Sequence, residues 1–180
     1  MNTWITPAAI VVSIGLAGST FAQSEKPLPV PGSGVAKEVP NAKELPDPNL
    51  TYKVLFDVSK AAPKPDQVSP VLDLLARYLN TLDKWNVPAE HRKLAVIFHQ
   101  TGVQAILNND VYKEKTGHDN PNIALIQNLK KAGVEFHVCG QGLLANKIGP
   151  NMILPGIETD LWALVSIVNF QTRGYTRIGN

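Results

Sequence analysis

The sequence contains a single cysteine, and this scarcity excludes three common kinds of site. One thiol cannot close an intramolecular disulfide, complete a cysteine-rich zinc site or form a Cys-x-x-Cys redox pair. An excess of charge is missing as well, because 17 Lys plus Arg stand against 15 Asp plus Glu and the basic residues are scattered. This balance indicates that nucleic acid is not a partner.

Motifs for metals and nucleotides are also lacking. The four histidines show no H-x-x-x-H spacing, and no Gly-Lys-Ser or Gly-Lys-Thr marks a P-loop. Gly140-Gln141-Gly142 resembles a fragment of a G-x-G-x-x-G phosphate cradle, but the third glycine position is Ala145 and no acidic ribose partner follows at the required distance. We therefore expect neither a metal site nor a bound cofactor.

The amino-terminal residues have the pattern of a secretory signal peptide. No charged residue precedes Glu25, an apolar run extends from Ala8 to Ala17, and Thr20-Phe21-Ala22 forms a small-x-small site. The run is shorter than the roughly 20 residues that span a bilayer. The sequence thus predicts a leader over residues 1–22 that is cleaved after Ala22, a periplasmic or secreted protein, and no membrane span after cleavage.

Residues 23–49 read as a proline-rich, flexible arm. Six of the chain's 14 prolines lie here, interleaved with Gly, Ser, Lys and Glu. Such a segment neither donates to a strand ladder nor offers an apolar face. The folded unit is then residues 50–180, a normal size for one domain.

Hydrophobic periodicity predicts alternating strands and helices within this unit. The expected strands cover residues 52–58, 94–99, 134–139, 152–154 and 175–178. The expected helices begin at Ser69-Pro70 as N-cap and first position, at Thr101 as a short helix, at Asn120-Pro121, near Leu143, and after Asp160 as the cap of a last apolar helix. Residues 108–120 read as a polar segment with little burial.

This alternation predicts an α/β fold, a single domain with a mostly parallel five-stranded sheet and helices on both faces. Ligands of such sheets gather at the carboxyl ends of the strands. That rule points to Asp57, His99 and Cys139. In a flavodoxin-like strand order the first strand separates the second from the third, so His99 would lie one strand away from Cys139 and Asp57 would lie closer.

Cys139 is the strongest candidate for chemistry because of its position. It ends a predicted strand just before Gly140 and Gly142, where the chain turns towards a helix. Backbone N–H groups at a helix start favour a negative group, and the thiolate is the nucleophilic form of cysteine. A free cysteine is also a common small apolar filler of protein cores. Position alone leaves both interpretations open.

Two histidines are candidate supporting residues. His99 would act as a base at a strand end, and His137 alternates with Cys139 on one side of its strand. Each also fits a hydrogen-bonded structural imidazole. Further candidates are Asp57 as a pocket residue and, as binding residues, Gly140, Gln141 and Gly142.

Several stretches together resemble the DsrE/DsrF-like family of small α/β proteins, which is linked to sulfur oxidation and sulfur relay. The matching stretches are the strand ending in His99, Leu107-Asn108-Asn109-Asp110 with Tyr112, Asn120-Pro121-Asn122, LKKAGVEFHVCGQGL, and Gly174-Tyr175-Thr176-Arg177-Ile178. They cover nearly the whole folded unit. One departure is Gln100, because the histidine of the second strand is commonly followed by Gly in this family.

The resemblance implies a homo-oligomer, often a trimer or hexamer, and a strand-terminal cysteine that accepts sulfane sulfur as a persulfide and passes it on. That sulfurtransferase-like role carries over to Cys139 alone, with an unknown sulfur donor and acceptor. Two alternatives stay open, namely a non-catalytic oligomeric small-ligand-binding module of the periplasm and a thiol redox sensor. The last helix, LWALVSIVNF, is apolar on more than one face, which indicates either a subunit contact or a deeply buried helix.

Overall fold

The computed structural model describes Met1 and residues 27–179. The predicted leader and its cleavage position after Ala22 lie outside these residues, and the division of the chain at residues 22 and 49 stays a prediction. Among the helices of the described residues, none combines the length and the apolar character that crossing a membrane requires.

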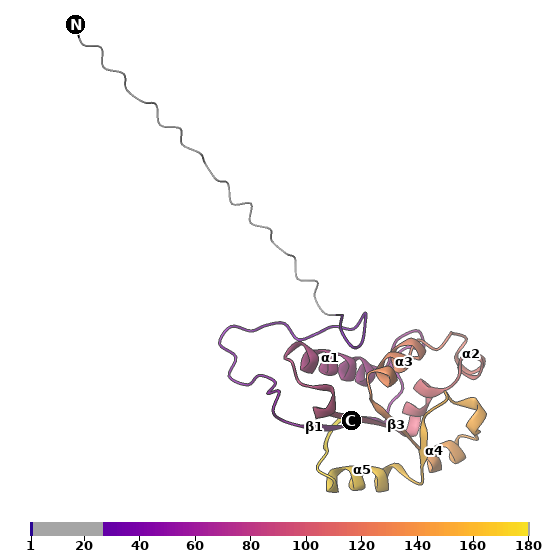
Figure 1. The fold of residues 1–180 in the computed structure, drawn as a ribbon. Coiled ribbons are helices and arrows are strands. Elements are labelled where there is room, and N and C mark those ends of the chain that lie inside the picture. The colour runs from indigo at the N-terminus through magenta and orange to yellow at the C-terminus, as the bar shows by residue number, and fades with distance from the viewer. Residues whose placement is uncertain (2–26, 180) are drawn as a thin grey trace.

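Within the described residues the chain forms five strands and five α-helices, and at least one α-helix lies between each strand and the next (Figure 1). The strands are β1 (Tyr52–Val58), β2 (Arg92–Phe98), β3 (Glu135–Cys139), β4 (Glu158–Asp160) and β5 (Thr176–Gly179). The α-helices are α1 (Pro70–Lys84), α2 (Asn109–Thr116), α3 (Ile123–Lys131), α4 (Gly140–Ala145) and α5 (Ala163–Thr172). Short 3-10 helices are η1 (Ala89–His91), η2 (Gln100–Ile106) and η3 (Pro150–Met152).

All five strands are parallel and form one sheet in the order β4-β3-β2-β1-β5. Helices α1 and α3 lie on one face of the sheet and α5 lies on the other (Figure 1). The prediction of an α/β fold with a five-stranded sheet and helices on both faces is confirmed.

The expected flavodoxin-like strand order is wrong. Strand β2, not β1, lies next to β3, so His99 follows a strand that neighbours the one ending in Cys139, and Asp57 is one strand further away. Each step from β1 to β4 moves to the next strand in one direction, and right-handed crossovers then place the connecting helices on the same face. The return from β4 to β5 runs the other way, which places α5 on the opposite face.

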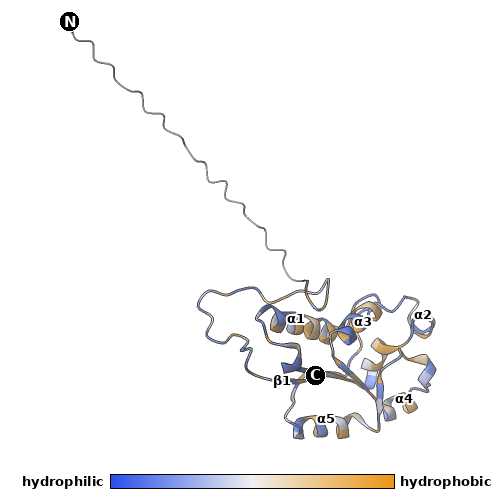
Figure 2. Ribbon diagram, viewed as in Figure 1, coloured by the Kyte–Doolittle hydropathy of each residue, from blue (hydrophilic) through white to orange (hydrophobic). Residues whose placement is uncertain are grey.

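Apolar side chains fill both sides of the central strands. Strands β1 and β2 are buried over their last five residues, as expected for strands covered on both faces. The larger cluster lies beneath α1 and α3, whose hydrophobic and hydrophilic residues alternate along the ribbon in Figure 2. The smaller cluster lies beneath α5 and includes Leu55, Ile97, Cys139 and Phe170. Cys139 therefore faces the side of the sheet that α5 covers.

Several expected elements differ in the structure. The fourth strand is Glu158–Asp160 and not residues 152–154, since Ile153 makes only an isolated antiparallel bridge with Leu107. Asp160 ends that strand, and Trp162 is the residue at the N-cap of α5. Ser69 precedes α1 as expected, but its hydroxyl caps no backbone N–H. The segment expected to be merely polar contains α2, which Asn108 caps by accepting from the N–H of Val111.

Part of the predicted arm lies against α1. Val30 is fully buried in the larger core. Asn80 of α1 holds the segment, because its side chain accepts from the N–H of Val30 at 3.0 Å and donates to the carbonyls of Val30, Ser33 and Gly34 at 3.0 to 3.2 Å. The expectation that this segment offers no apolar face is wrong at Val30. Val30 can be buried here because the side-chain amide of Asn80 provides hydrogen-bond partners for the backbone around it.

Candidate functional site

A pocket of about 490 Å³ opens at the carboxyl ends of the strands, on the side that α5 covers. Its lining comes from the ends of β2 and β3, from α4, from the start of α5 and from β5. The lining residues are His99, Gln100, Cys139, Gln141, Gly142, Ala145, Asn146, Trp162, Ala163, Leu164, Ile167 and Arg177. The structure thus brings His99, Cys139, Gln141 and Gly142 of the predicted site residues to one cavity.

The sulfur of Cys139 receives two backbone hydrogen bonds. Cys139 is both the last residue of β3 and the N-cap of α4, so its Sγ accepts from the N–H of Gly142 at 3.4 Å. The N–H of Ala163, the first residue of α5, donates to the same sulfur at 3.3 Å. Both donors belong to helix starts, and such donors stabilise a negative charge on the atom that they face. Only 4% of Cys139 is exposed, so a reagent reaches the sulfur through the pocket.

Asp57 connects two basic residues of the pocket from behind. Its side chain is fully buried, and its Oδ1 lies 2.6 Å from Nε2 of His99. Nε of Arg177 donates to Oδ2 of Asp57 at 2.8 Å, and Nη2 of Arg177 lies 2.5 Å from the same oxygen in an ion pair. Asp57 does not line the pocket itself. It instead fixes the positions of His99 and Arg177, which do.

The pKa of Asp57 follows from this environment. Burial alone would raise the pKa, but the hydrogen bond and charge of His99, and then those of Arg177, outweigh burial and bring the pKa below its usual value. The carboxylate is therefore ionised at neutral pH and stays bonded to both partners.

His137 lies away from this pocket. Its Nδ1 is 3.2 Å from Oδ1 of Asp160, and its ring packs edge-on against Phe170 with the ring centroids 5.1 Å apart. Two further carboxylates, of Glu135 and Glu158, lie 3.9 to 4.0 Å from the ring nitrogens. Although His137 shares the face of β3 with Cys139, these contacts give it a packing and pairing role beneath α5.

The glycines of α4 have different surroundings. A Cβ added at Gly140 would lie 2.7 Å from the carbonyl oxygen of Asp160, so close packing requires glycine there. A Cβ added at Gly142 would make ordinary contacts, 3.8 Å from Sγ of Cys139 and 3.9 Å from the backbone nitrogen of Gln100. Gly142 thus leaves space beside the sulfur. The N–H of Gly142 is already used by Cys139, so the glycine fragment that resembles a phosphate cradle lacks that donor as well.

Gln100 has a backbone conformation that favours glycine. Its φ is +49°, in the left-handed region, directly after His99. The chain turns here from β2 into η2, which brings the backbone of Gln100 to the pocket. A glycine at this position would adopt the same turn without strain.

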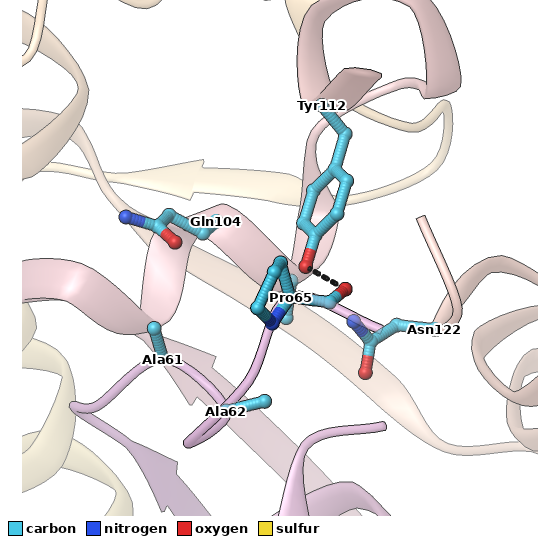
Figure 3. Close-up of a pocket in the computed structure, with 7 residues that line it drawn as sticks. Ala61, Ala62, Pro65, Gln104, Tyr112 and Asn122 are labelled. Atoms are coloured by element: carbon cyan, nitrogen blue, oxygen red, sulfur yellow. Dashed lines mark hydrogen bonds between the residues drawn. The ribbon is translucent and has the colours of Figure 1, made fainter. Parts of the chain in front are cut away.

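A second, smaller cavity of about 100 Å³ lies under the loop after β1 (Figure 3). Burial, and then the nearby Asp66 carboxylate, raise the pKa of Tyr112, so its hydroxyl stays protonated and donates to the carbonyl of Pro65 at 2.8 Å. Asn122 lines the same cavity and accepts from the N–H of Ser69 at 2.8 Å. Asn120 in turn donates to two carbonyls of η2 and its exit. Tyr112, Asn122 and Asn120 thus hold the loops around this cavity in place through hydrogen bonds to backbone groups.

Across residues 27–179, no group of three or more His, Cys, Asp or Glu side chains is arranged to hold a metal ion. His91 instead bonds the carbonyl of Pro48, and His118 is exposed.

Two contributors to the pocket have no local signature in the sequence. Arg177 meets Asp57 across 120 residues, and the only hint is a charged residue in each of two strands that become neighbours. The donor from Ala163 is a backbone N–H, which no residue type reveals.

Comparisons with known proteins agree with this fold. The family model described as DsrE/DsrF-like family matches residues 53–178. A solved structure from Methanobacterium thermoautotrophicum, MTH1491, described as a protein of unknown function, has a TM-score of 0.50 at 22% sequence identity and covers 71% of this chain and 97% of its own. That likeness shows the shared fold. No curated protein matches the chain.

Proposed function

This chain belongs to the DsrE/DsrF-like family, and from that premise we propose that it is an exported sulfur carrier in which Cys139 holds sulfane sulfur as a persulfide. Family membership suggests a sulfur-relay-like role. The carrier assignment adds that Cys139 takes sulfur from a donor and yields it to a second thiol.

The observation that carries the proposal is the environment of the Cys139 sulfur. Two backbone N–H groups, from Gly142 and Ala163, donate to it at the floor of a pocket large enough for a small molecule. A sulfur that served only as core filler would need neither donor. The same donors would stabilise the negative charge of a persulfide, and the transfer requires no metal.

Sulfur loading tests the proposal directly. We expect the purified protein, incubated with inorganic polysulfide, to gain about 32 Da, the mass of one sulfur atom, on the peptide that contains Cys139. A small acceptor thiol should remove the gain. Because the chain has no other cysteine, Cys139→Ser is a clean control and should gain nothing. Failure of folded wild-type protein to load, together with failure to react with alkylating reagents at neutral pH, would overturn the proposal.

The same variant separates the two alternatives. A small-ligand-binding module would keep its ligand-induced thermal stabilisation in Cys139→Ser, whereas a carrier loses its sulfur loading. A redox sensor would form a disulfide-linked dimer in peroxide. Because Cys139 is 4% exposed, its sulfur has little room to reach a second chain.

Export and assembly belong to the same proposal. A cleaved leader predicts that secreted or periplasmic protein begins at Gln23, which amino-terminal sequencing would show. A homo-oligomer, a trimer or hexamer in the family pattern, is supported by the large apolar side chains exposed on and just before α5. These are Leu161, Trp162, Leu164, Val165 and Val168, which are between 42% and 74% exposed.

A further inference from the structure

The Cys139 pocket has a charge pattern that sulfur transfer alone does not require. Within the described part of the chain, its lining residues include no aspartate or glutamate, whereas Arg177 and His99 are both basic. The wall on the α5 side is apolar, from Trp162, Leu164 and Ile167. This lining suits a small molecule that carries a negative group and an apolar part.

Arg177 keeps a donor group free for such a ligand. Its Nε donates to Asp57 and its Nη2 forms an ion pair with the same carboxylate, whereas no hydrogen bond or ion pair joins Nη1 to another described residue. The Arg177 side chain is 41% exposed, while Asp57 behind it is fully buried. A guanidinium fixed along one edge is pre-organised to bind an oxyanion with its remaining donors.

Asp57 offsets part of the positive charge of Arg177. The attraction of an anion to the pocket therefore depends on which polar atoms are directed into the pocket as well as on the net charge. The two oxygens of Asp57 are directed at His99 and Arg177 and are shielded from the pocket. The pocket side therefore presents donors. They are joined by the backbone nitrogen of Gln100, which borders the same space beside Gly142 as the Cys139 sulfur.

We propose that this pocket selects a small sulfane-sulfur donor that carries a carboxylate or sulfonate, with the oxyanion at Arg177 and the outer sulfur at Cys139. The inference rests on the carrier function proposed above and names its substrate class. The Cys139 thiolate attacks the outer sulfur of a persulfide R–S–SH. The S–S bond of the donor breaks, R–S⁻ leaves with the electron pair, and Cys139 holds Cys–S–SH with the proton still on the transferred sulfur. No external oxidant or reductant is consumed.

Two thiol reagents of opposite charge test the selectivity. Sulfonatoethyl and trimethylammonioethyl methanethiosulfonate present the same reactive sulfur, and the thiolate forms a disulfide with it while methanesulfinate leaves with the electron pair. Rates of Cys139 labelling are measured by intact mass at low ionic strength, and each is divided by the reagent's rate with free 2-mercaptoethanol. We expect the normalised rate of the anionic reagent to exceed that of the cationic one by roughly tenfold.

Variants assign this preference to Arg177. Arg177→Gln should bring the ratio close to one. Arg173→Gln removes the same charge at the far end of α5, about 15 Å along the helix from Ala163, and should leave the ratio unchanged. If Arg177→Gln does not fold, added salt serves instead, because screening should lower the wild-type ratio towards one.

The outcomes separate the two proposals. A wild-type ratio near one, a ratio that Arg177→Gln leaves unchanged, or a ratio insensitive to salt overturns the anion selectivity, even while neutral methyl methanethiosulfonate and polysulfide still modify Cys139. If none of these reagents modifies Cys139 in the folded protein, the carrier function itself fails.

Discussion

Asp57 is the residue on which the arrangement of both basic side chains of the pocket depends. Its pKa is lower in the folded chain than in the unfolded chain, so folding favours the carboxylate. The stability that results is complete above the usual aspartate pKa of about 3.9 and is lost as the pH falls through the lower folded value.

Replacing Asp57 by Asn should therefore lower the free energy of unfolding at pH 7 by about 2 kcal/mol, less than for a fully buried ion pair because His99 and Arg177 are partly exposed. Denaturant titrations should show this loss at pH 7 and a smaller difference from wild type at the acid end. Asp73→Asn, at an exposed site in α1, should stay within about 0.5 kcal/mol of wild type at every pH. Equal pH profiles for wild type and Asp57→Asn would contradict the assignment.

Gln100 stores backbone strain next to the pocket. A left-handed conformation costs a residue with a Cβ roughly 1 to 2 kcal/mol, and glycine regains most of this at some cost in chain entropy. We expect Gln100→Gly to raise the free energy of unfolding by up to about 1 kcal/mol. Gln104→Gly, in the same 3-10 helix but without a positive φ, should lower it by about 0.5 to 1 kcal/mol. Thermal denaturation of both variants checks the pair, and a loss of stability in Gln100→Gly would show that the Gln100 side chain matters more than its φ.

At the residue scale, the sequence predicts the positions of Asp57, His99 and Cys139 at the carboxyl edge of the sheet. It does so because the residue pattern shows where a strand ends before a turn. The same reasoning did not reveal Arg177. An ion pair that joins residues 120 positions apart depends on which strands become neighbours, and hydrophobic periodicity carries no such information.

Helix α4 contains two glycines with different roles. Gly140 allows close packing against the neighbouring backbone, and Gly142 leaves access to the Cys139 sulfur. In Gly140→Ala the new Cβ meets the Asp160 carbonyl at 2.7 Å, so we expect a loss of about 1 to 3 kcal/mol in stability. In Gly142→Ala the Cβ makes ordinary contacts and the helix gains a better helix former, so stability should be kept. The added methyl group fills the space beside the Cys139 sulfur, and alkylation of Cys139 should slow severalfold. Unchanged labelling kinetics in Gly142→Ala would place the route to the sulfur elsewhere.

At the element scale, the kinds and approximate bounds of most strands and helices were predictable, whereas the order of the strands was not. The alternation of strands and helices is the same whether β1 or β2 lies next to β3, so no residue pattern distinguishes the two orders. The fourth strand was misplaced because Ile153 and Leu154 are apolar for another reason, namely their packing against the larger core. Strand β4 itself is three residues long and mostly exposed, which leaves no hydrophobic pattern to detect.

For the whole molecule, the exposed apolar face of α5 predicts association. Val168, 52% exposed, should tolerate a charge in an isolated chain but not in a buried subunit contact. We expect Val168→Glu to reduce the mass measured by light scattering to that of one chain. Leu74→Glu, 45% exposed on α1 at the opposite face, should leave the oligomer intact. Wild-type protein that already has the mass of one chain would rule out this use of α5.

Strand β5 makes one side of the pocket less stable towards local unfolding than the other. It is an edge strand of four residues that pairs with β1 alone, and it carries Arg177, whereas Cys139 ends a strand paired on both sides. Short edges fray at lower cost than interior strands, so the amide hydrogens of residues 176–178 should exchange with solvent well before those of residues 136–138. Each such opening withdraws the guanidinium while the sulfur and its two donors stay in place. Moderate warming should therefore lower the ratio of anionic to cationic labelling rates at Cys139 well below the temperature at which the whole domain unfolds.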